Sequence, residues 1–250
     1  MAIPIPLTGI SQLLDCIFLF VAWSLVGQRL KQAGDQAIIT VGHIYRYFGY
    51  FVLFNIFMTL PYAVLYLRPD WFPAAMGWGY VVANIFLVIS LSHLSRMVAQ
   101  MVPQWSSKEP LIHGLWVVIN VVLTGLNVVY VAILAQPGYD NASGVTRFHI
   151  PGGLGATLGM ISLLAYLPAL VLFVMNAVKG HGDQRRRSIL LAAGMLLIMV
   201  VGPLHAVAAN WEVFLLADAL NVVSLVLLAG GVLYRIGSSL AASPQPASVR

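Results

Sequence analysis

Two aspartates and a histidine stand inside long apolar stretches of this 250-residue chain, where they are the side chains best suited to chemistry. Asp15 and Asp218 each lie about six residues, or about 9 Å, from the same end of their stretches, and His205 lies about four residues from it. Ionisable groups within a bilayer are costly and mark ligand sites or ion and proton pathways. These positions predict an outward-facing intramembrane pocket that binds a small ligand. Its predicted lining is Asp15, Asn127, His205, Asn210, Glu212 and Asp218.

A second polar layer is predicted deeper, about nine to eleven residues into four of the stretches and so near the bilayer midplane. Its members are all asparagines: Asn55, Asn84, Asn120 and Asn221. Amides at this depth form hydrogen bonds between helices that contribute about 0.6 kcal/mol on average. Interhelical packing and a role in a binding site are both open interpretations of this layer.

Three histidines, His43, His93 and His113, fall toward the opposite side of the membrane from the predicted pocket. Two histidines on facing helices are the usual axial ligands of a b-type haem, so haem binding through His93 is an open alternative. No other cofactor is predicted. Cys16 is the one cysteine, and no closely spaced histidine pair accompanies it, so the sequence predicts no metal site.

The elements that hold these residues are predicted to be seven transmembrane helices in an all-α bundle. Sixty percent of the residues are hydrophobic and 8% are charged, whereas soluble domains carry about 25% charged residues. Each stretch is long enough to cross the ~30 Å hydrocarbon core. The predicted spans are about 9–28, 45–67, 73–101, 111–135, 153–178, 188–209 and 212–234, in one membrane domain over 1–236. Residues 237–250 are small, polar and proline-bearing, which predicts a disordered tail.

The basic residues predict the orientation of the bundle. Of the 13 lysines and arginines, all except Arg68 and Arg147 fall on one side of the predicted spans. Because that side is normally cytoplasmic, the N-terminus is expected outside and the C-terminus inside. The densest run, Arg185, Arg186 and Arg187, is predicted to contact anionic lipid or a cytoplasmic partner. This bias explains the net charge of +5 without a nucleic acid. We expect a multi-pass protein of the cell membrane, which is the inner membrane in a bacterium.

Enzyme and rhodopsin chemistry lack their usual motifs. The last span has no lysine for a retinal Schiff base, and the aspartates stand in LLDCI and LADAL rather than in a Gly-x-Gly-Asp setting. Neither a Gly-x-Ser-x-Gly elbow nor a Walker loop is present. No enzymatic activity is therefore predicted. The GxxxG from Gly155 to Gly159 is expected to pack within the bundle, with a dimer face as the alternative.

The topology resembles the seven-helix membrane sensory modules of bacterial histidine kinases. The resemblance covers nearly the whole chain. It rests on the short loops, the outside N-terminus, the basic aromatic segment HIYRYFGYFVLFNIFMTLPY and the direct exit of the last helix into the cytoplasm. The resemblance implies a sensor. In the histidine kinases such modules are followed by signalling domains, whereas this sequence stops at Arg250, so the output is expected to pass through a protein partner.

Three functions are therefore predicted for testing. The first is a membrane sensor or receptor-like subunit that binds a small ligand in the outer pocket and signals through a cytoplasmic partner. The second is a small proton- or cation-coupled transporter that uses the same carboxylates. The third is a structural or haem-binding subunit of a larger membrane complex.

Overall fold

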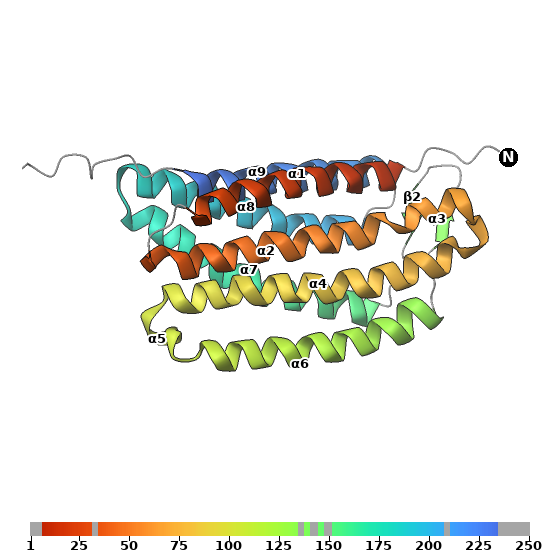
Figure 1. Cartoon of the computed structure of the whole chain (residues 1–250), viewed down its shortest axis with the longest axis horizontal. Helices are drawn as coiled ribbons and strands as arrows, with labels where there is room; N and C mark the ends of the chain where they lie inside the picture. The colour runs from red at the N-terminus through yellow and green to blue at the C-terminus, as the bar shows by residue number, and fades with distance from the viewer. Residues whose placement is uncertain are drawn as a thin grey trace, which may run out of the picture.

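Long apolar helices dominate the fold, which is that of a multi-pass membrane protein (Figure 1). The computed structural model describes residues 7–31, 35–134, 138–140, 145–147, 152–207 and 211–234. Within these ranges, seven helical segments are long and apolar enough to cross a membrane, as the sequence predicted. The helices are α1 (Leu7–Lys31), α2 (Asp35–Thr59), α3 (Pro61–Leu67), η1 (Pro69–Trp71), α4 (Phe72–Met101), α5 (Pro103–Ser106), α6 (Glu109–Asn127), η2 (Val128–Leu134), α7 (Gly152–Lys179), α8 (Gly182–Val207) and α9 (Trp211–Leu233).

Successive long helices run in opposite directions, which gives the bundle two distinct ends (Figure 1). One end carries Lys31, Lys108 and Lys179, and we call it the basic end. The other end carries the strands β1 (Gly138–Asp140) and β2 (Val145–Arg147), and we call it the hairpin end. The strands pair antiparallel, with Tyr139 opposite Thr146. This short hairpin lies between the predicted spans that end at 135 and begin at 153. Apart from it, the described chain is almost entirely helical, as the predicted all-α class requires.

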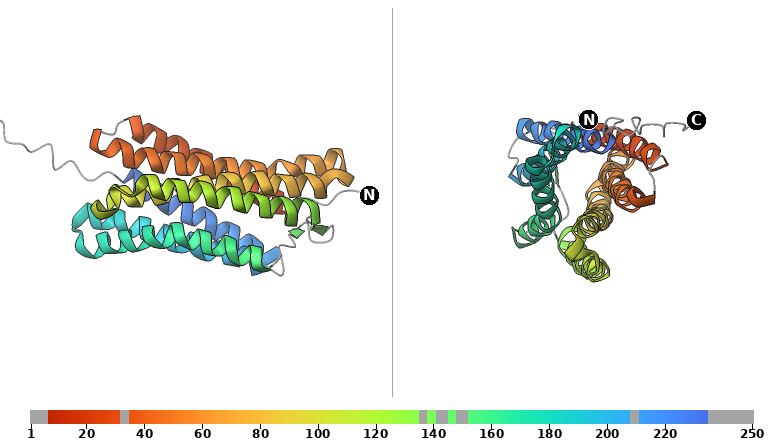
Figure 2. Two further views of the ribbon diagram at one scale, coloured as in Figure 1. Left: turned by 90° about the horizontal axis from the view of Figure 1, so that it is seen from below. Right: turned by 90° about the vertical axis from the view of Figure 1, so that its left-hand side faces the viewer.

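Six long helices close into a ring in the order α1, α2, α4, α7, α8 and α9, with α9 packed back against α1 (Figure 2). The seventh, α6, lies outside this ring and packs against α4. The core between the helices is apolar and includes Phe48, Leu91, Met97 and Leu228. Ring closure therefore makes the first and last helices neighbours, and it places α6 on the far side of α4 from them.

Apolar side chains also cover the outside of the bundle, which is the arrangement expected of a lipid-facing surface. Leu111 is 73% exposed and Val121 is 68% exposed, and both belong to α6. In a soluble protein this surface would be exposed to water, and soluble proteins rarely expose so large a continuous apolar surface. Contact with a lipid bilayer follows from this surface.

Several helices extend further than the predicted spans. Helix α2 begins at Asp35, ten residues before the predicted span at 45, and α8 begins at Gly182, six residues before 188. Residues 35–44 and 182–187 are therefore helical rather than loop, and α5 occupies part of the predicted 102–110 loop. Apolar content identifies only the part of a helix that lies in hydrocarbon, whereas backbone hydrogen bonding continues beyond it. At Gly182 a φ of 55° permits the tight turn from α7 into α8.

Candidate ligand-binding cluster

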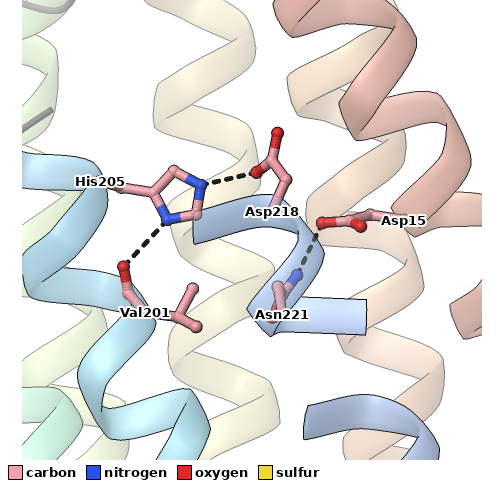
Figure 3. A network of polar contacts seen from close by, with 5 residues as sticks. All are labelled: Asp15, Val201, His205, Asp218 and Asn221. Carbon is pink, nitrogen blue, oxygen red and sulfur yellow. Dashed lines mark hydrogen bonds and ion pairs between the residues drawn. The ribbon is translucent and has the colours of Figure 1, made fainter. Parts of the chain in front are cut away.

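Asp15 and Asn221 connect the first and last helices of the ring. Asn221 Nδ2 donates a hydrogen bond to Asp15 Oδ2 at 2.7 Å, and both side chains are buried (Figure 3). Asp15 lies about two turns into α1, and Asn221 lies in the middle of α9. Both helices run from the hairpin end to the basic end, so their parallel packing brings the two residues to a similar level. The amide thus satisfies one oxygen of a carboxylate that would otherwise be buried without a partner.

His205 connects α8 to α9 through the second carboxylate. Its Nε2 lies 2.6 Å from Asp218 Oδ1, and its Nδ1 lies 3.0 Å from the carbonyl oxygen of Val201. Since a carbonyl can only accept, Nδ1 carries a hydrogen. The Nε2 contact is then either an imidazolium donating to a carboxylate or a protonated Asp218 donating to a neutral ring, and in both cases the pair is neutral overall. Phe214 packs edge-on against the imidazole, with ring centroids 5.0 Å apart.

We call Asp15, His205, Asp218 and Asn221 together the carboxylate cluster. Each of its two carboxylates, Asp15 and Asp218, has one oxygen without a partner among the described residues. Asp15 Oδ1 and Asp218 Oδ2 are buried, and no donor in the described part of the chain reaches them. The cluster holds two carboxyl groups and one imidazole, so it is one positive charge short of neutrality when both carboxyls are ionised. A buried carboxylate oxygen without a donor costs free energy, which a proton, a cation or a hydrogen-bond donor would recover.

Ring closure brings together only part of the predicted pocket. Asp15, His205 and Asp218 meet as predicted. Asn127 lies on α6, whose main neighbour is α4, so helix packing places it away from the cluster. Asn127 is fully buried, and neither of its side-chain polar atoms has a partner among the described residues. Glu212 is exposed in the first turn of α9. Asn210 lies outside the described residues.

The four asparagines of the predicted midplane layer do not act alike. Asn55 and Asn84 donate to the carbonyls of Phe51 and Tyr80, one turn earlier in their own helices. Asn120 reaches Ile85 O on α4 at 3.4 Å, which makes it an interhelical contact. Asn221 belongs to the carboxylate cluster instead. The signal that identifies it is its spacing: it follows Asp218 by three residues, which places both on one helix face.

Polar contacts join α8 to α9 along their whole length. Besides His205 and Asp218, Ser224 Oγ donates to Gly194 O at 2.9 Å, and Arg187 Nε donates to Gly231 O at 3.0 Å. Arg187 is thus partly buried against α9, whereas its neighbours Arg185 and Arg186 are exposed. Of the predicted arginine contact surface, these two side chains remain exposed, although Arg186 also interacts with Tyr234 and Asp183.

His43 and His93 form a direct pair between α2 and α4, nearer the basic end. Their Nδ1 atoms are 3.1 Å apart and their ring centroids are 5.4 Å apart, so the two Nδ1 atoms point almost directly at each other. Both are buried, and Tyr50 stacks on His93 with an interplanar angle of 7°. Bonds from imidazole nitrogen to a metal are each about 2.0–2.1 Å. A haem iron between these two nitrogens therefore does not fit this spacing, which suits one shared hydrogen.

The GxxxG of α7 makes no close contact within the bundle. A Cβ added at Gly155 or at Gly159 would meet nothing within 4 Å in the described structure. The prediction that this motif packs within the bundle is therefore wrong, because the motif faces outward. Close approach of helix backbones occurs instead at Gly194 and Gly231, where a Cβ would come within 2.7 Å and 2.6 Å of leucine side chains.

No protein-family model matches the chain, and no curated protein matches it in sequence. We therefore infer its function from the geometry of the carboxylate cluster and from the bundle around it.

Proposed function

We propose that the protein is a seven-helix membrane sensor whose carboxylate cluster binds a small amphipathic ligand with a positive charge or hydrogen-bond donors. One observation carries the proposal: Asp15 and Asp218 are buried, and each presents one carboxylate oxygen that no described donor satisfies. An ammonium or guanidinium group supplies the missing charge and several N–H donors. Its apolar part would be compatible with the surrounding lipid-facing helices.

The proposed response is a shift of α8 and α9 as one unit. The hydrogen bonds from His205, Ser224 and Arg187 tie these helices together from one end to the other. Pro203 lies two residues before His205 and has no N–H to donate to the carbonyl four residues earlier. This missing backbone hydrogen bond makes α8 deformable next to the cluster. A ligand that binds one of two packings more tightly shifts the population between them. The shift would reach the basic end through the α8–α9 pair.

The proposed orientation places the hairpin end outside the cell and the basic end in the cytoplasm. It is supported by the lysines and arginines within the described ranges, of which only Arg68 and Arg147 lie toward the hairpin end. In this orientation the carboxylate cluster is reached from outside, and exposed Arg185 and Arg186 face the cytoplasm. A cytoplasmic or membrane protein partner would receive the signal there.

A thermal-stability screen in detergent tests the ligand proposal, with guanidinium, methylammonium, choline, sodium and potassium as probes. At least one probe is expected to raise the Tm of the wild type, because a ligand at 100 times its Kd adds about 2.7 kcal/mol. The double variant Asp15→Asn with Asp218→Asn is expected to lose that increase. The matched control is Glu212→Gln, which removes an exposed carboxylate near the same end and should keep it. Equal probe effects in the wild type and the double variant would overturn the proposal.

The same cluster also supports a second function, a proton- or cation-coupled transporter. The supporting observation is the His205–Asp218 contact, where one proton can reside on either partner while a second carboxylate lies close by. Intramembrane networks of this kind serve as proton relays in transporters. Flux into proteoliposomes that depends on pH and is lost in Asp218→Asn would favour the transporter. A partner-dependent response without flux would favour the sensor.

A further inference from the structure

A groove between α1 and α2 lies on the opposite half of the bundle from the carboxylate cluster. Its volume is about 200 Å³, and it is lined by Trp23, Tyr45, Arg46, Gly49 and Tyr50. This is several times the ~30 Å³ that one water occupies in the liquid. Arg46 lies five residues after Val41, where the apolar span of α2 begins, so the groove lies close to the basic end.

The groove is lined by one charged side chain, which is positive. Arg46 is exposed, and no carboxylate pairs with it in the described part of the chain. Trp23 Nε1 is buried and has no acceptor among the described residues. No acidic side chain lines the groove. An exposed guanidinium without a carboxylate partner, in a groove without an acidic side chain, matches an anionic group that accepts hydrogen bonds.

The ring of Trp23 is fixed in position by its neighbours. It stacks on Tyr45 with centroids 5.3 Å apart, and Phe20 packs against it edge-on at 5.8 Å. Gly49 gives the indole its space, because a Cβ there would lie 3.0 Å from Nε1. The indole is therefore held in place as one wall of the groove, with its N–H buried.

The walls and the location of the groove indicate where the anion comes from. Three aromatic rings form the walls, and the exposed apolar side chain of Phe20 continues from Trp23 along the outside of α1. A free inorganic anion gains nothing from such walls, whereas a lipid places its phosphate in the groove and an acyl chain along α1. Indole and phenol rings favour the same interfacial depth.

We propose that this groove is a binding site for an anionic phospholipid, with the phosphodiester on the Arg46 guanidinium and the lipid packed against the Trp23 ring. Arg binds phosphate through charge-assisted, often bidentate hydrogen bonds. The neighbouring rings of Tyr45 and Tyr50 would pack against the glycerol region. The site is separate from the carboxylate cluster, and it does not depend on the function proposed for that cluster.

The test is tryptophan fluorescence in nanodiscs of phosphatidylcholine with a minor fraction of brominated lipid, since bromine quenches an indole that it touches. Brominated phosphatidylglycerol is expected to quench more strongly than brominated phosphatidylcholine, with about a fivefold preference for one arginine contact. Trp23→Phe should remove the excess because it removes the reporting indole. Arg46→Gln keeps the indole and should also remove the excess. Lys179→Gln is the control, since it removes an exposed cation of the same end on α7 and should leave the excess intact.

Two results would overturn the proposal. The first is an Arg46→Gln variant that is quenched like the wild type while its Tm shows that it is folded. The second is loss of the excess on addition of inorganic phosphate, which would assign the groove to a free anion instead of a lipid.

Discussion

Asn221 donates a hydrogen bond to Asp15 across 206 positions of sequence, and the contact joins the last helix of the bundle to the first. Both groups are buried, so neither has water as an alternative partner. The bond therefore closes the ring of helices at the level of the proposed ligand site. A change in the ionisation or ligation of Asp15 would act directly on the α1–α9 contact.

The Asp15–Asn221 bond can be measured with a double-mutant cycle. Asn221→Leu is expected to lower the free energy of unfolding by about 1–3 kcal/mol, because it leaves Asp15 buried without a partner. Asp15→Leu combined with Asn221→Leu should cost less than the two single changes together. The expected coupling is about 1 kcal/mol, within the range up to ~1.7 measured between membrane helices. Unfolding in mixed micelles supplies the four energies.

Asn55→Leu is the control for this cycle, because its amide bonds to its own helix and not to Asp15. Combined with Asp15→Leu, it should show no coupling. Effects of Asn221 and Asp15 that add within about 0.3–0.5 kcal/mol would contradict the bond.

The α8–α9 contact depends on two glycines that have no room for a methyl group. In Gly194→Ala, the new Cβ would lie 2.7 Å from Leu228 Cγ and 3.0 Å from Ser224 O. In Gly231→Ala, it would lie 2.6 Å from Leu191 Cγ. Overpacking costs about 1–3 kcal/mol, which exceeds the gain of at most about 1 kcal/mol in helix propensity. Both variants should lower the Tm.

Gly230→Ala is the matched control on α9, since a Cβ there meets nothing within 4 Å. It should keep or raise the Tm, because only the helix propensity changes. A similar loss of Tm in all three variants would mean that glycine flexibility matters in α8 and α9 rather than close packing.

The positions of the helices could be predicted, because they depend on local sequence. The contacts between helices could not, because they depend on which way each side chain points around its helix. Continuous apolar stretches gave the seven spans, and counting residues gave Asp15, His205 and Asp218 one common depth. Depth alone could not show that Asn221 faces Asp15 or that α6, with Asn127, lies outside the ring. Those facts depend on which helices are neighbours. Likewise, apolar content could not locate the start of α8, because a helix continues into the polar region.

The His43–His93 pair predicts an uncommon set of tautomers. If the two Nδ1 atoms share one hydrogen, one ring is the Nδ1–H tautomer and its partner is the Nε2–H tautomer. Nitrogen-15 spectra of histidine-labelled protein, compared with His43→Ala and His93→Ala variants, should show one ring of each kind. Two Nε2–H tautomers, or a Soret band from haem in the purified protein, would contradict this geometry.

The central claim is that the carboxylate cluster holds a small ligand, and native mass spectrometry tests it most directly. Protein would be extracted in mild detergent from the membranes in which it is made, as wild type, as Asp15→Asn with Asp218→Asn, and as Glu212→Gln. We predict that a small cationic or donor-rich molecule stays bound to the wild type and to Glu212→Gln and is absent from the double variant. The same bound masses in all three proteins, or no bound small molecule in any of them, would contradict the claim.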